Sequence, residues 1–271
     1  MATEFIKLYS ERNSGSNWLR SIVDANIDAR SFPLTGKERR QIPGQDRMPK
    51  EIRKLTRALP PRDPKEFEAR KDKINEVRSK WSFGWKHCAP QLETLQESSL
   101  FDKTAFIFLV KNPYWFVRSL HTRPYNRLVN NKVTLDKFAT QPWPLQGRDG
   151  LTGEYVDSPI HLWQEKLRAY LAVMEAVPDK TILIKYEECI VDIEAVLRQI
   201  AEKFSVPRLE LKVMTADSKS GVERDPNYYI NKYLATDYEK YFSAKSLAFM
   251  NAALDQDLTG SLGYETAKIP A

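Results

Sequence analysis

A short polar loop near the N-terminus has the composition of a phosphate-binding turn. Residues 5–9 are mostly apolar and predict a first β-strand, and residues 18–23 predict the start of a helix. Backbone N–H groups of the intervening turn and the positive end of the helix would favour an anion, and Gly15 permits its close approach. The loop has one glycine and no Lys after it, which disfavours a nucleoside-triphosphate hydrolase. An ordinary strand–turn–helix with a serine cap is the alternative.

Two further apolar runs end in side chains that suit the same chemistry. Residues 104–110 are continuously apolar and predict a strand buried on both faces of a parallel sheet. Lys111 follows directly, an Asn-Pro pair begins a helix, and Ser119 lies about two turns along it. Because open α/β sheets bind ligands at the C-terminal ends of their strands, Lys111 and Ser119 are expected to hold one phosphate. Residues 180–185 predict another buried strand, which ends at Tyr186.

These three segments, in this order, resemble the sulfotransferase family that uses 3′-phosphoadenosine 5′-phosphosulfate. The first loop of that family usually reads K/R-S-G-T-T/S-W-L, and residues 13–19 read Asn-Ser-Gly-Ser-Asn-Trp-Leu. The second motif usually reads R-N-P-x-D-x-x-x-S, and residues 111–119 keep its spacing, from the initial Lys to the final Ser. The third, Y-E-D, corresponds to Tyr-Glu-Glu at residues 186–188. The resemblance spans most of the chain, although residues 30–80 match nothing in the family.

The resemblance implies which residues bind the donor and its product, adenosine 3′,5′-bisphosphate. The family's loop holds the 5′-phosphosulfate, its second motif and a late R-K-G element hold the 3′-phosphate, and aromatic residues flank the adenine. The matching residues here are Arg12, Asn13, Ser14, Gly15, Ser16, Asn17, Trp18, Lys111, Ser119, Tyr186, Lys219 and Arg224. The chain departs from the family at Asn13, where the family has a cation, and at Trp115, where it has an acid. Arg12 and Lys86 are both candidates for the missing charge.

His87 is the expected catalytic base. The family places a histidine after a second strand and before the 3′-phosphate motif, and residues 81–87 are expected to form a short aromatic strand that ends at His87. An ordinary imidazole titrates near neutral pH and suits removal of a proton from a hydroxyl or amine. His121 is the competing histidine. Lys86 or Arg12, together with the loop's N–H groups, would stabilise charge on the departing oxygen, so both are included in the predicted catalytic group.

The acceptor is expected to bind among the loops of residues 121–160, since loops above a parallel sheet commonly set specificity. The candidate acceptor contacts are His121, Tyr125, Trp143 and Trp163, and packing roles are equally open for the aromatic residues. Residues 30–80 are predicted to be an insertion of loops and short helices, or a lid. Residues 37–80 contain 15 Lys and Arg against 8 Asp and Glu, a net charge of +7. A solvated charged surface is the alternative, and nucleic-acid binding is disfavoured because the segment lacks interleaved aromatics.

The composition fits one α/β domain over residues 1–271, a three-layer sandwich with a central, mainly parallel sheet. No run approaches the ~18 apolar residues of a membrane span, no signal peptide precedes the first strand, and the two cysteines form no disulfide framework. No metal-ligand spacing is present. The sequence therefore predicts a cytoplasmic, metal-independent enzyme that sulfates a small molecule. We expect it to be a monomer or a homodimer and to bind neither nucleic acid nor membrane. A small-molecule kinase and a catalytically silent nucleotide-binding module are the alternatives, and Asn13 favours the second.

Overall fold

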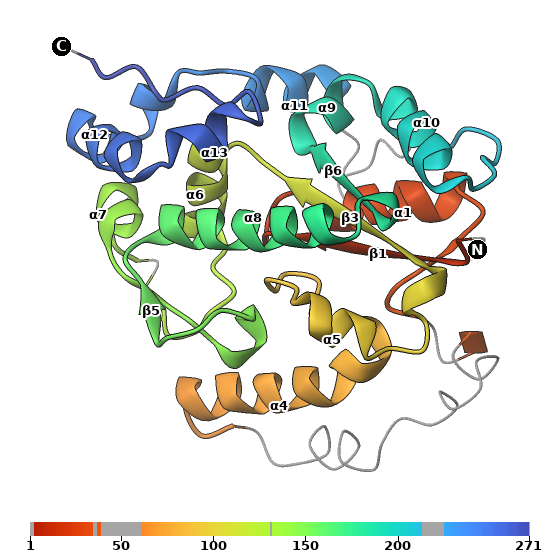
Figure 1. The fold of residues 1–271 in the computed structure, drawn as a ribbon. Helices are drawn as coiled ribbons and strands as arrows, with labels where there is room; N and C mark the ends of the chain where they lie inside the picture. The colour runs from red at the N-terminus through yellow and green to blue at the C-terminus, as the bar shows by residue number, and fades with distance from the viewer. Residues whose placement is uncertain (1–2, 35–36, 39–60, 131, 213–224, 271) are drawn as a thin grey trace.

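The computed structural model describes residues 3–34, 37–38, 61–130, 132–212 and 225–270 (Figure 1). Four parallel strands form its main sheet, in the spatial order β2–β1–β3–β6. Their bounds are Phe5–Ser10 for β1, Arg30–Ser31 for β2, Thr104–Val110 for β3 and Thr181–Lys185 for β6. Helices flank this sheet, so the predicted α/β fold with a central parallel sheet is confirmed. The three apolar runs that the sequence assigned to strands are β1, β3 and β6.

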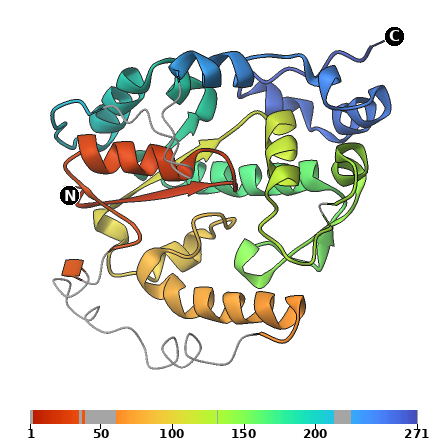
Figure 2. The same cartoon turned by 180° about the vertical axis from the view of Figure 1, so that it is seen from behind.

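The two faces of the sheet carry different kinds of side chain, because successive residues of a strand point to opposite sides. One face presents aliphatic residues such as Leu8 and Ile107, and α1 and α10 pack against it. The other face presents aromatic residues such as Tyr9 and Phe108, and α8 packs against it. α8 crosses in front of the sheet in Figure 1, and α1 covers the opposite face, toward the viewer in Figure 2. Each face is therefore closed by its own layer of core.

The remaining elements surround this sandwich. The helices are α1 Ser16–Asn26, α4 Pro64–Ser82, α5 Leu92–Gln96, α6 Pro113–Thr122, α7 Leu135–Thr140, α8 Pro159–Ala176, α9 Tyr186–Val191, α10 Ile193–Phe204, α11 Pro226–Tyr233, α12 Ala244–Ala253 and α13 Gln256–Gly260. Short 3₁₀ turns occupy Phe101–Lys103, Gly147–Asp149, Pro178–Lys180 and Tyr238–Lys240. β4 Trp143–Pro144 and β5 Tyr155–Val156 form a separate antiparallel pair.

The expectation of a strand over residues 81–87 is wrong. α4 continues through Ser82, and turns and bends without a strand follow as far as Pro90. Phe83 and Gly84 both adopt left-handed backbone conformations, with φ of 56° and 75°, which reverse the chain at the end of the helix. Side chains of β1, rather than a β-ladder, hold this segment, as described below. α4 also corrects the expectation of only short helices within residues 30–80, since it alone has 19 residues.

Two features are absent from the part of the chain that the structure describes. No helix in it is both long and apolar enough to span a bilayer. No group of three or more His, Cys, Asp or Glu side chains within the same residues is arranged to hold a metal ion.

Candidate active site

The polar loop after β1 lies at the edge of the sheet where three strands end. The strand register pairs Ser10 with Leu109 and Val110 with Lys185, so the residues that follow β1, β3 and β6 converge there. Gly15 has a left-handed φ of 84°, and a Cβ at this position would lie 2.4 Å from a ring carbon of Tyr186. Only glycine therefore fits between the loop and the Tyr186 ring. The first and third sequence motifs are packed directly against each other.

Unsatisfied polar groups in this loop fit an anionic ligand. The Ser14 side chain is 1% exposed, and its Oγ has no hydrogen-bond partner among the described residues. The Oγ of Ser10, at the end of β1, is in the same situation. No side chain caps the N-terminus of α1, which begins at Ser16. Buried hydroxyls without partners are costly, and an anion at a helix N-terminus would satisfy them together with the first N–H groups of the helix.

Lys111 and Ser119, the pair predicted to hold a phosphate, are brought together. The Nζ of Lys111 lies 3.4 Å from the Ser119 Oγ, although Lys111 is only 1% exposed. The same Nζ lies 4.8 Å from the ring centre of Tyr186 and 3.6 Å from that of Tyr233. The rings of Trp18 and Tyr186 meet edge to face with centroids 6.3 Å apart. A buried cation, a hydroxyl and a set of aromatic rings thus occupy one corner of the site.

The sequence did not identify Tyr233, which α11 brings to Lys111 from far along the chain. It also missed Glu187, whose carboxylate accepts the backbone N–H of Asn112 at 2.9 Å and the Tyr264 hydroxyl at 2.9 Å. The only signal for Glu187 was its place in the Tyr-Glu-Glu motif. Trp115, where the family has an acid, packs its ring against Tyr233 and two other tyrosines instead. This departure replaces a charge with an aromatic contact.

His87 is oriented as a proton acceptor. Its side chain is 5% exposed, and Nδ1 lies 2.7 Å from the backbone oxygen of Ser10. A carbonyl oxygen only accepts, so Nδ1 carries the hydrogen and Nε2 keeps the lone pair. Burial, followed by the positive charges of Lys86 and Arg12, holds the pKa of His87 well below its usual value. The imidazole is therefore neutral at neutral pH and able to take up a proton.

The two candidate loop cations take different positions. Lys86 Nζ donates to the side-chain oxygen of Asn17 in the loop. The Arg12 guanidinium lies over the ring of Tyr125, 5.5 Å from its centre. Asn13, which replaces the family's cation, donates to the backbone oxygens of Ser119 and Arg123 at 3.3 and 2.9 Å. Asn13 therefore ties the loop to the end of α6, while Lys86 contacts the loop and Arg12 extends toward residues 121–160.

Side chains and backbone of β1 hold the segment that carries His87 from one side. The buried ammonium of Lys7 donates to the backbone oxygens of Ser82 and Gly84, the latter at 2.7 Å. The Tyr9 hydroxyl donates to the oxygen between them, that of Phe83. Next along β1, the Ser10 N–H donates to the oxygen of Lys86 at 2.9 Å. Burial lowers the pKa of Lys7 to about 7.

An ion cluster holds the same segment from the other side. The Lys166 ammonium, from α8, donates to the backbone oxygen of His87 at 2.6 Å. It also lies 3.0 Å from a carboxylate oxygen of Glu11 and 3.0 Å from one of Asp149, and all three side chains are buried. Burial alone would lower the pKa of Lys166, but the two carboxylates outweigh it and raise the pKa. Neither buried lysine was foreseen from the sequence.

The predicted acceptor contacts divide into two groups. Tyr125 packs between Trp85 and Trp143, at centroid distances of 5.2 and 5.3 Å, and its hydroxyl donates to Asp149 at 2.7 Å. Trp85 in turn packs edge-on against His87 at 5.0 Å, so Tyr125 belongs to the surroundings of His87.

The other three predicted contacts pack into the protein. Trp143 is 0% exposed. Trp163 is 2% exposed and donates to the backbone oxygen of Lys111 at 2.9 Å. His121 lies 2.9 Å from the Val133 oxygen. The structure thus favours the packing alternative for both tryptophans. Lys219 and Arg224 lie outside the described residues.

The fold and this edge of the sheet define an α/β protein with a polar, glycine-containing loop at the C-terminal ends of its parallel strands. No family model matches the chain, and no curated protein matches it. Among solved structures it is similar to the sulfotransferase domain from the curacin biosynthetic pathway, with 15% identity, a TM-score of 0.43, and 98% of this chain and 99% of that chain covered.

Two further solved structures are similar over nearly their whole length. The sulfotransferase domain from the Synechococcus PCC 7002 olefin synthase has 21% identity and a TM-score of 0.47, with 98% of this chain and 97% of that chain covered. A sulfotransferase from Alicyclobacillus acidocaldarius has 16% identity and a TM-score of 0.41, with 93% and 96% covered. At these identities the similarity is one of fold, and by itself it says nothing about the chemistry of this chain.

Proposed function

We propose that this protein is a sulfotransferase that moves a sulfuryl group from 3′-phosphoadenosine 5′-phosphosulfate to a hydroxyl or nitrogen of a small molecule. The observation that carries the proposal is the convergence, at one edge of the sheet, of two separate sets of donor groups that suit an anion, together with a neutral histidine. One set is the loop around Ser14 and the uncapped start of α1. The other is Lys111 with Ser119, and His87 lies behind the loop, bonded to Ser10.

The form of the donor matches this arrangement. The donor carries negative charge at two separate places, the 3′-phosphate and the 5′-phosphosulfate, on a ribose that also bears the adenine. Lys111 and Ser119 would hold the 3′-phosphate, and the loop residues would hold the 5′-phosphosulfate. Trp18 and Tyr186, whose rings already meet, would hold the adenine. A nucleoside triphosphate has one continuous run of phosphates and no 3′-phosphate, so it would leave Lys111 and Ser119 without an anionic partner.

The protein's part in the reaction is to position the reactants and to neutralise charge. His87 takes the acceptor's proton at Nε2, while Nδ1–H stays bonded to the Ser10 oxygen and keeps the ring in place. The acceptor atom forms its bond to sulfur as the bond from sulfur to the 5′-phosphate oxygen breaks, and the bisphosphate leaves with that electron pair. Lys86, which contacts the loop through Asn17, supplies the positive charge that Asn13 lacks. Arg12 is then left for the acceptor side.

Calorimetric titration with adenosine 3′,5′-bisphosphate, against ATP with Mg²⁺, tests the donor. The bisphosphate should bind in preference to Mg·ATP, and Lys111→Met should weaken its binding at least tenfold, because a charge-assisted contact to phosphate is lost. Lys180→Met is the matched control, since Lys180 precedes β6 at the opposite end of the sheet and donates to Asp102. Preference for Mg·ATP would favour a kinase, and binding of neither nucleotide would remove the proposal.

Substitution of the base separates an enzyme from a silent nucleotide-binding module. In a screen with the sulfuryl donor and a panel of phenols, alcohols and amines, His87→Gln should lower turnover by about 10²- to 10⁴-fold while the affinity for the bisphosphate is retained. Gln at this position keeps the side chain polar but has no lone pair of comparable basicity. Tight bisphosphate binding by the wild-type protein, without transfer to any acceptor in the panel, would favour the silent module.

A further inference from the structure

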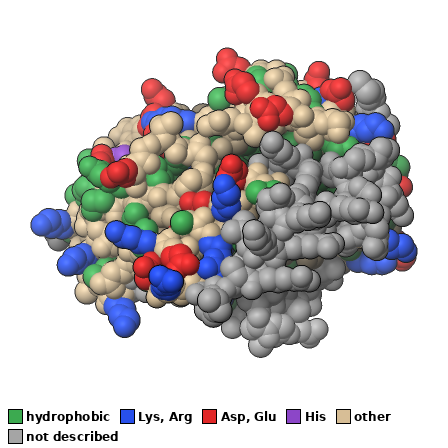
Figure 3. All heavy atoms as spheres, turned by 90° about the horizontal axis from the view of Figure 1, so that it is seen from below, with side chains coloured by type: hydrophobic (Ala, Val, Ile, Leu, Met, Phe, Trp, Pro, Cys, Tyr) green, Lys and Arg blue, Asp and Glu red, His purple; other side chains and the backbone are tan. Residues whose placement is uncertain are grey.

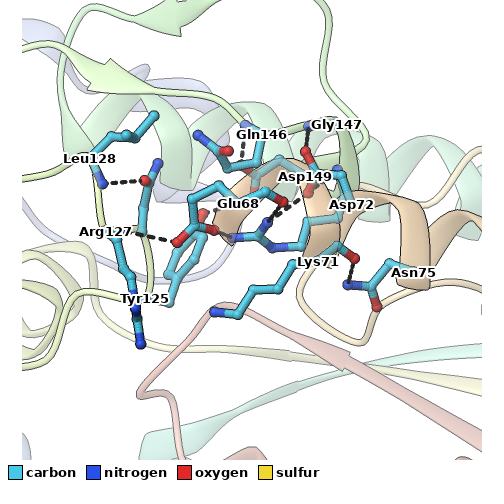
Figure 4. A network of polar contacts seen from close by, with 12 residues as sticks. Glu68, Lys71, Asp72, Asn75, Tyr125, Arg127, Leu128, Gln146, Gly147 and Asp149 are labelled. Carbon is cyan, nitrogen blue, oxygen red and sulfur yellow. Dashed lines mark hydrogen bonds and ion pairs between the residues drawn. The ribbon is translucent and has the colours of Figure 1, made fainter. Parts of the chain in front are cut away.

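α4 is joined to the turn at residues 147–149 by a closed set of ion pairs. Arg148 is buried and pairs with Glu68 and with Asp72, the latter at 2.6 Å (Figure 4). Glu68 also accepts the backbone N–H of Arg127 at 3.0 Å. Two carboxylates thus surround one guanidinium; together they more than neutralise its charge and raise the pKa of Arg148 despite its burial. Arg148 is committed to holding the fold and is not available to a ligand.

Two other cations beside this network have no such partners. The Lys71 Nζ and the Arg127 Cζ both lie over the ring of Phe67, at 4.2 and 3.4 Å from its centre. In Figure 4 both side chains extend away from the carboxylates of Asp72 and Asp149. Burial lowers the pKa of Lys71, and so do the neighbouring charges of Arg148, Arg12 and Arg127, against the opposing effect of Glu68. Within the described part of the chain, no salt bridge reaches Arg12, Lys71 or Arg127.

This contrasts with the outer side of the same helix. There Arg70 pairs with Glu66 at 3.0 Å and Lys73 with Glu76 at 3.9 Å, and basic and acidic side chains lie beside each other on the surface seen from below (Figure 3). The basic residues on that side are therefore paired with acids. Arg12 and Lys71 are half-buried and Arg127 is exposed, and no carboxylate pairs with any of the three among the described residues, so this group of like charges favours an anion.

The cluster lies on the acceptor side of the proposed base. Arg12 is one of the charges that lower the pKa of His87, and its guanidinium covers Tyr125. Tyr125 contacts Trp85, and Trp85 contacts His87. Lys111 and the other residues proposed for the 3′-phosphate have their own aromatic surroundings, Tyr186 and Tyr233. The two groups of cations are therefore distinct, one beside the proposed nucleotide site and one beside the base.

We propose that the acceptor is itself an anion, a molecule that bears a carboxylate as well as the hydroxyl or amine to be sulfated, and that Lys71 and Arg127 bind its carboxylate next to Arg12. This inference rests on the proposed sulfotransferase function. A guanidinium can hold a carboxylate with two parallel hydrogen bonds, and an ammonium adds a point charge from the other side. The partial burial of Arg12 and Lys71 strengthens their interactions with an anion relative to a fully exposed surface, while Arg127 is exposed.

Matched pairs of acids and their methyl esters test the proposal. 4-Hydroxybenzoate, 4-hydroxyphenylacetate and 4-aminobenzoate are each compared with the ester, which keeps the reacting group and removes the charge. The ratio of kcat/KM for acid over ester should be about tenfold or more in the wild-type protein. It should approach one in the Lys71→Gln/Arg127→Gln double variant. Lys65→Gln, an exposed residue of the same helix, is the control and should keep the wild-type ratio. Esters accepted as well as the acids, or transfer to the esters but to none of the acids, would overturn the inference.

Two further readouts keep this result separate from the donor proposal. The affinity for adenosine 3′,5′-bisphosphate should be the same in the double variant and the wild type; a loss there, with an unchanged acid-to-ester ratio, would show that the cluster attracts the donor and would overturn the inference. Ligand-observed NMR on the nucleotide-free protein measures acid and ester binding directly. Preferential acid binding that the double variant loses would support the carboxylate site even if the bisphosphate does not bind, and equal binding of acid and ester would count against it.

Discussion

Two buried lysines hold the His87 segment, and their surroundings are electrostatic opposites. Lys7, on β1, donates to the oxygens of Ser82 and Gly84 and has no carboxylate in contact among the described residues. Lys166, on α8, donates to the His87 oxygen and lies against two carboxylates. Burial lowers the pKa of Lys7 to about 7, whereas the carboxylates raise the pKa of Lys166. Lys7 therefore holds the segment as a hydrogen-bond donor whose charge depends on pH near neutrality. Lys166 holds the same segment from the other side and stays positively charged.

The difference between Lys7 and Lys166 indicates which of their contacts contributes most to the stability of the fold and which makes that stability depend on pH. A buried lysine with acids is part of a compensated cluster, and removing it leaves buried negative charge behind. A buried lysine among carbonyl oxygens leaves only unsatisfied acceptors when it is removed, and its own desolvation cost disappears with it. The first kind of substitution should therefore be more damaging at neutral pH, and the second should depend more on pH.

Lys166→Met should have the largest effect. It leaves Glu11 and Asp149 buried without their cation. Burial raises the pKa of Glu11 to about 7 even beside Lys166, so at pH 7 Asp149 is the main stranded charge. We expect a loss of about 3–5 kcal/mol in the free energy of unfolding, measured by urea denaturation at pH 7. Adding Glu11→Gln should recover more of the loss at pH 9 than at pH 7, because Glu11 carries an uncompensated charge only above its raised pKa. Arg168→Met, at an exposed ion pair on the same helix, is the control and should cost less than about 1 kcal/mol. A loss for Lys166→Met no larger than that of the control would contradict the comparison.

Lys7→Met should cost less at pH 7, about 1–2 kcal/mol, since two carbonyl oxygens lose a donor while no charge is stranded. The sign of the pH effect follows from proton binding. Between about 7 and 10.5 the unfolded chain keeps the Lys7 proton that the folded protein has lost, so wild-type stability rises with pH through this window. The variant lacks this rise, so its deficit should be about 2–3 kcal/mol larger at pH 9 than at pH 7. Equal deficits at the two pH values in urea denaturation would refute a titrating Lys7.

Tyr9→Phe isolates the hydrogen bond from the charge. It removes the donor to the Phe83 oxygen from the same face of β1, and a loss of about 1 kcal/mol is expected. Burial raises the pKa of Tyr9 well above its usual value, so the hydroxyl stays protonated at pH 7 and at pH 9. The deficit of this variant in the same urea measurements should therefore not change between the two pH values. A deficit that grew as it does in Lys7→Met would show that the pH effect comes from the segment rather than from Lys7.

Local pattern was sufficient for one half of the site. Continuous apolar runs identified β1, β3 and β6. The spacing from Lys111 to Ser119 predicted that the two side chains lie together, because a strand end and the following helix fix their separation. These relations lie within short stretches of chain. Gly15 was likewise recognisable, since only glycine permits the turn and the contact with Tyr186.

The other half depended on contacts that no local pattern records. Trp81, Phe83 and Trp85 alternate along the sequence as in a strand, but α4 extends to Ser82 and the left-handed Phe83 and Gly84 end it. The carbonyl oxygens freed there are taken up by side chains of β1, more than seventy residues earlier. The cluster of Glu11, Asp149 and Lys166 joins three distant parts of the chain. Its members were visible only as ordinary charged residues.

The smallest expected effect is on His87 itself, and it ranks the neighbouring charges. The pKa of His87 is lowered first by burial and then by Lys86, Arg12 and Lys166, in that order, and Lys7 is not among the causes. Lys86→Met should therefore raise the pKa of His87 more than Lys166→Met does, while Lys7→Met should leave it unchanged. ¹H NMR titration of the imidazole Cε1–H signals measures this, with His121 and His161 as internal references. The acid limb of the pH–rate profile should move to higher pH in the same order. A shift of the His87 pKa caused by Lys7→Met, or no shift caused by Lys86→Met, would contradict this ranking of the neighbouring charges.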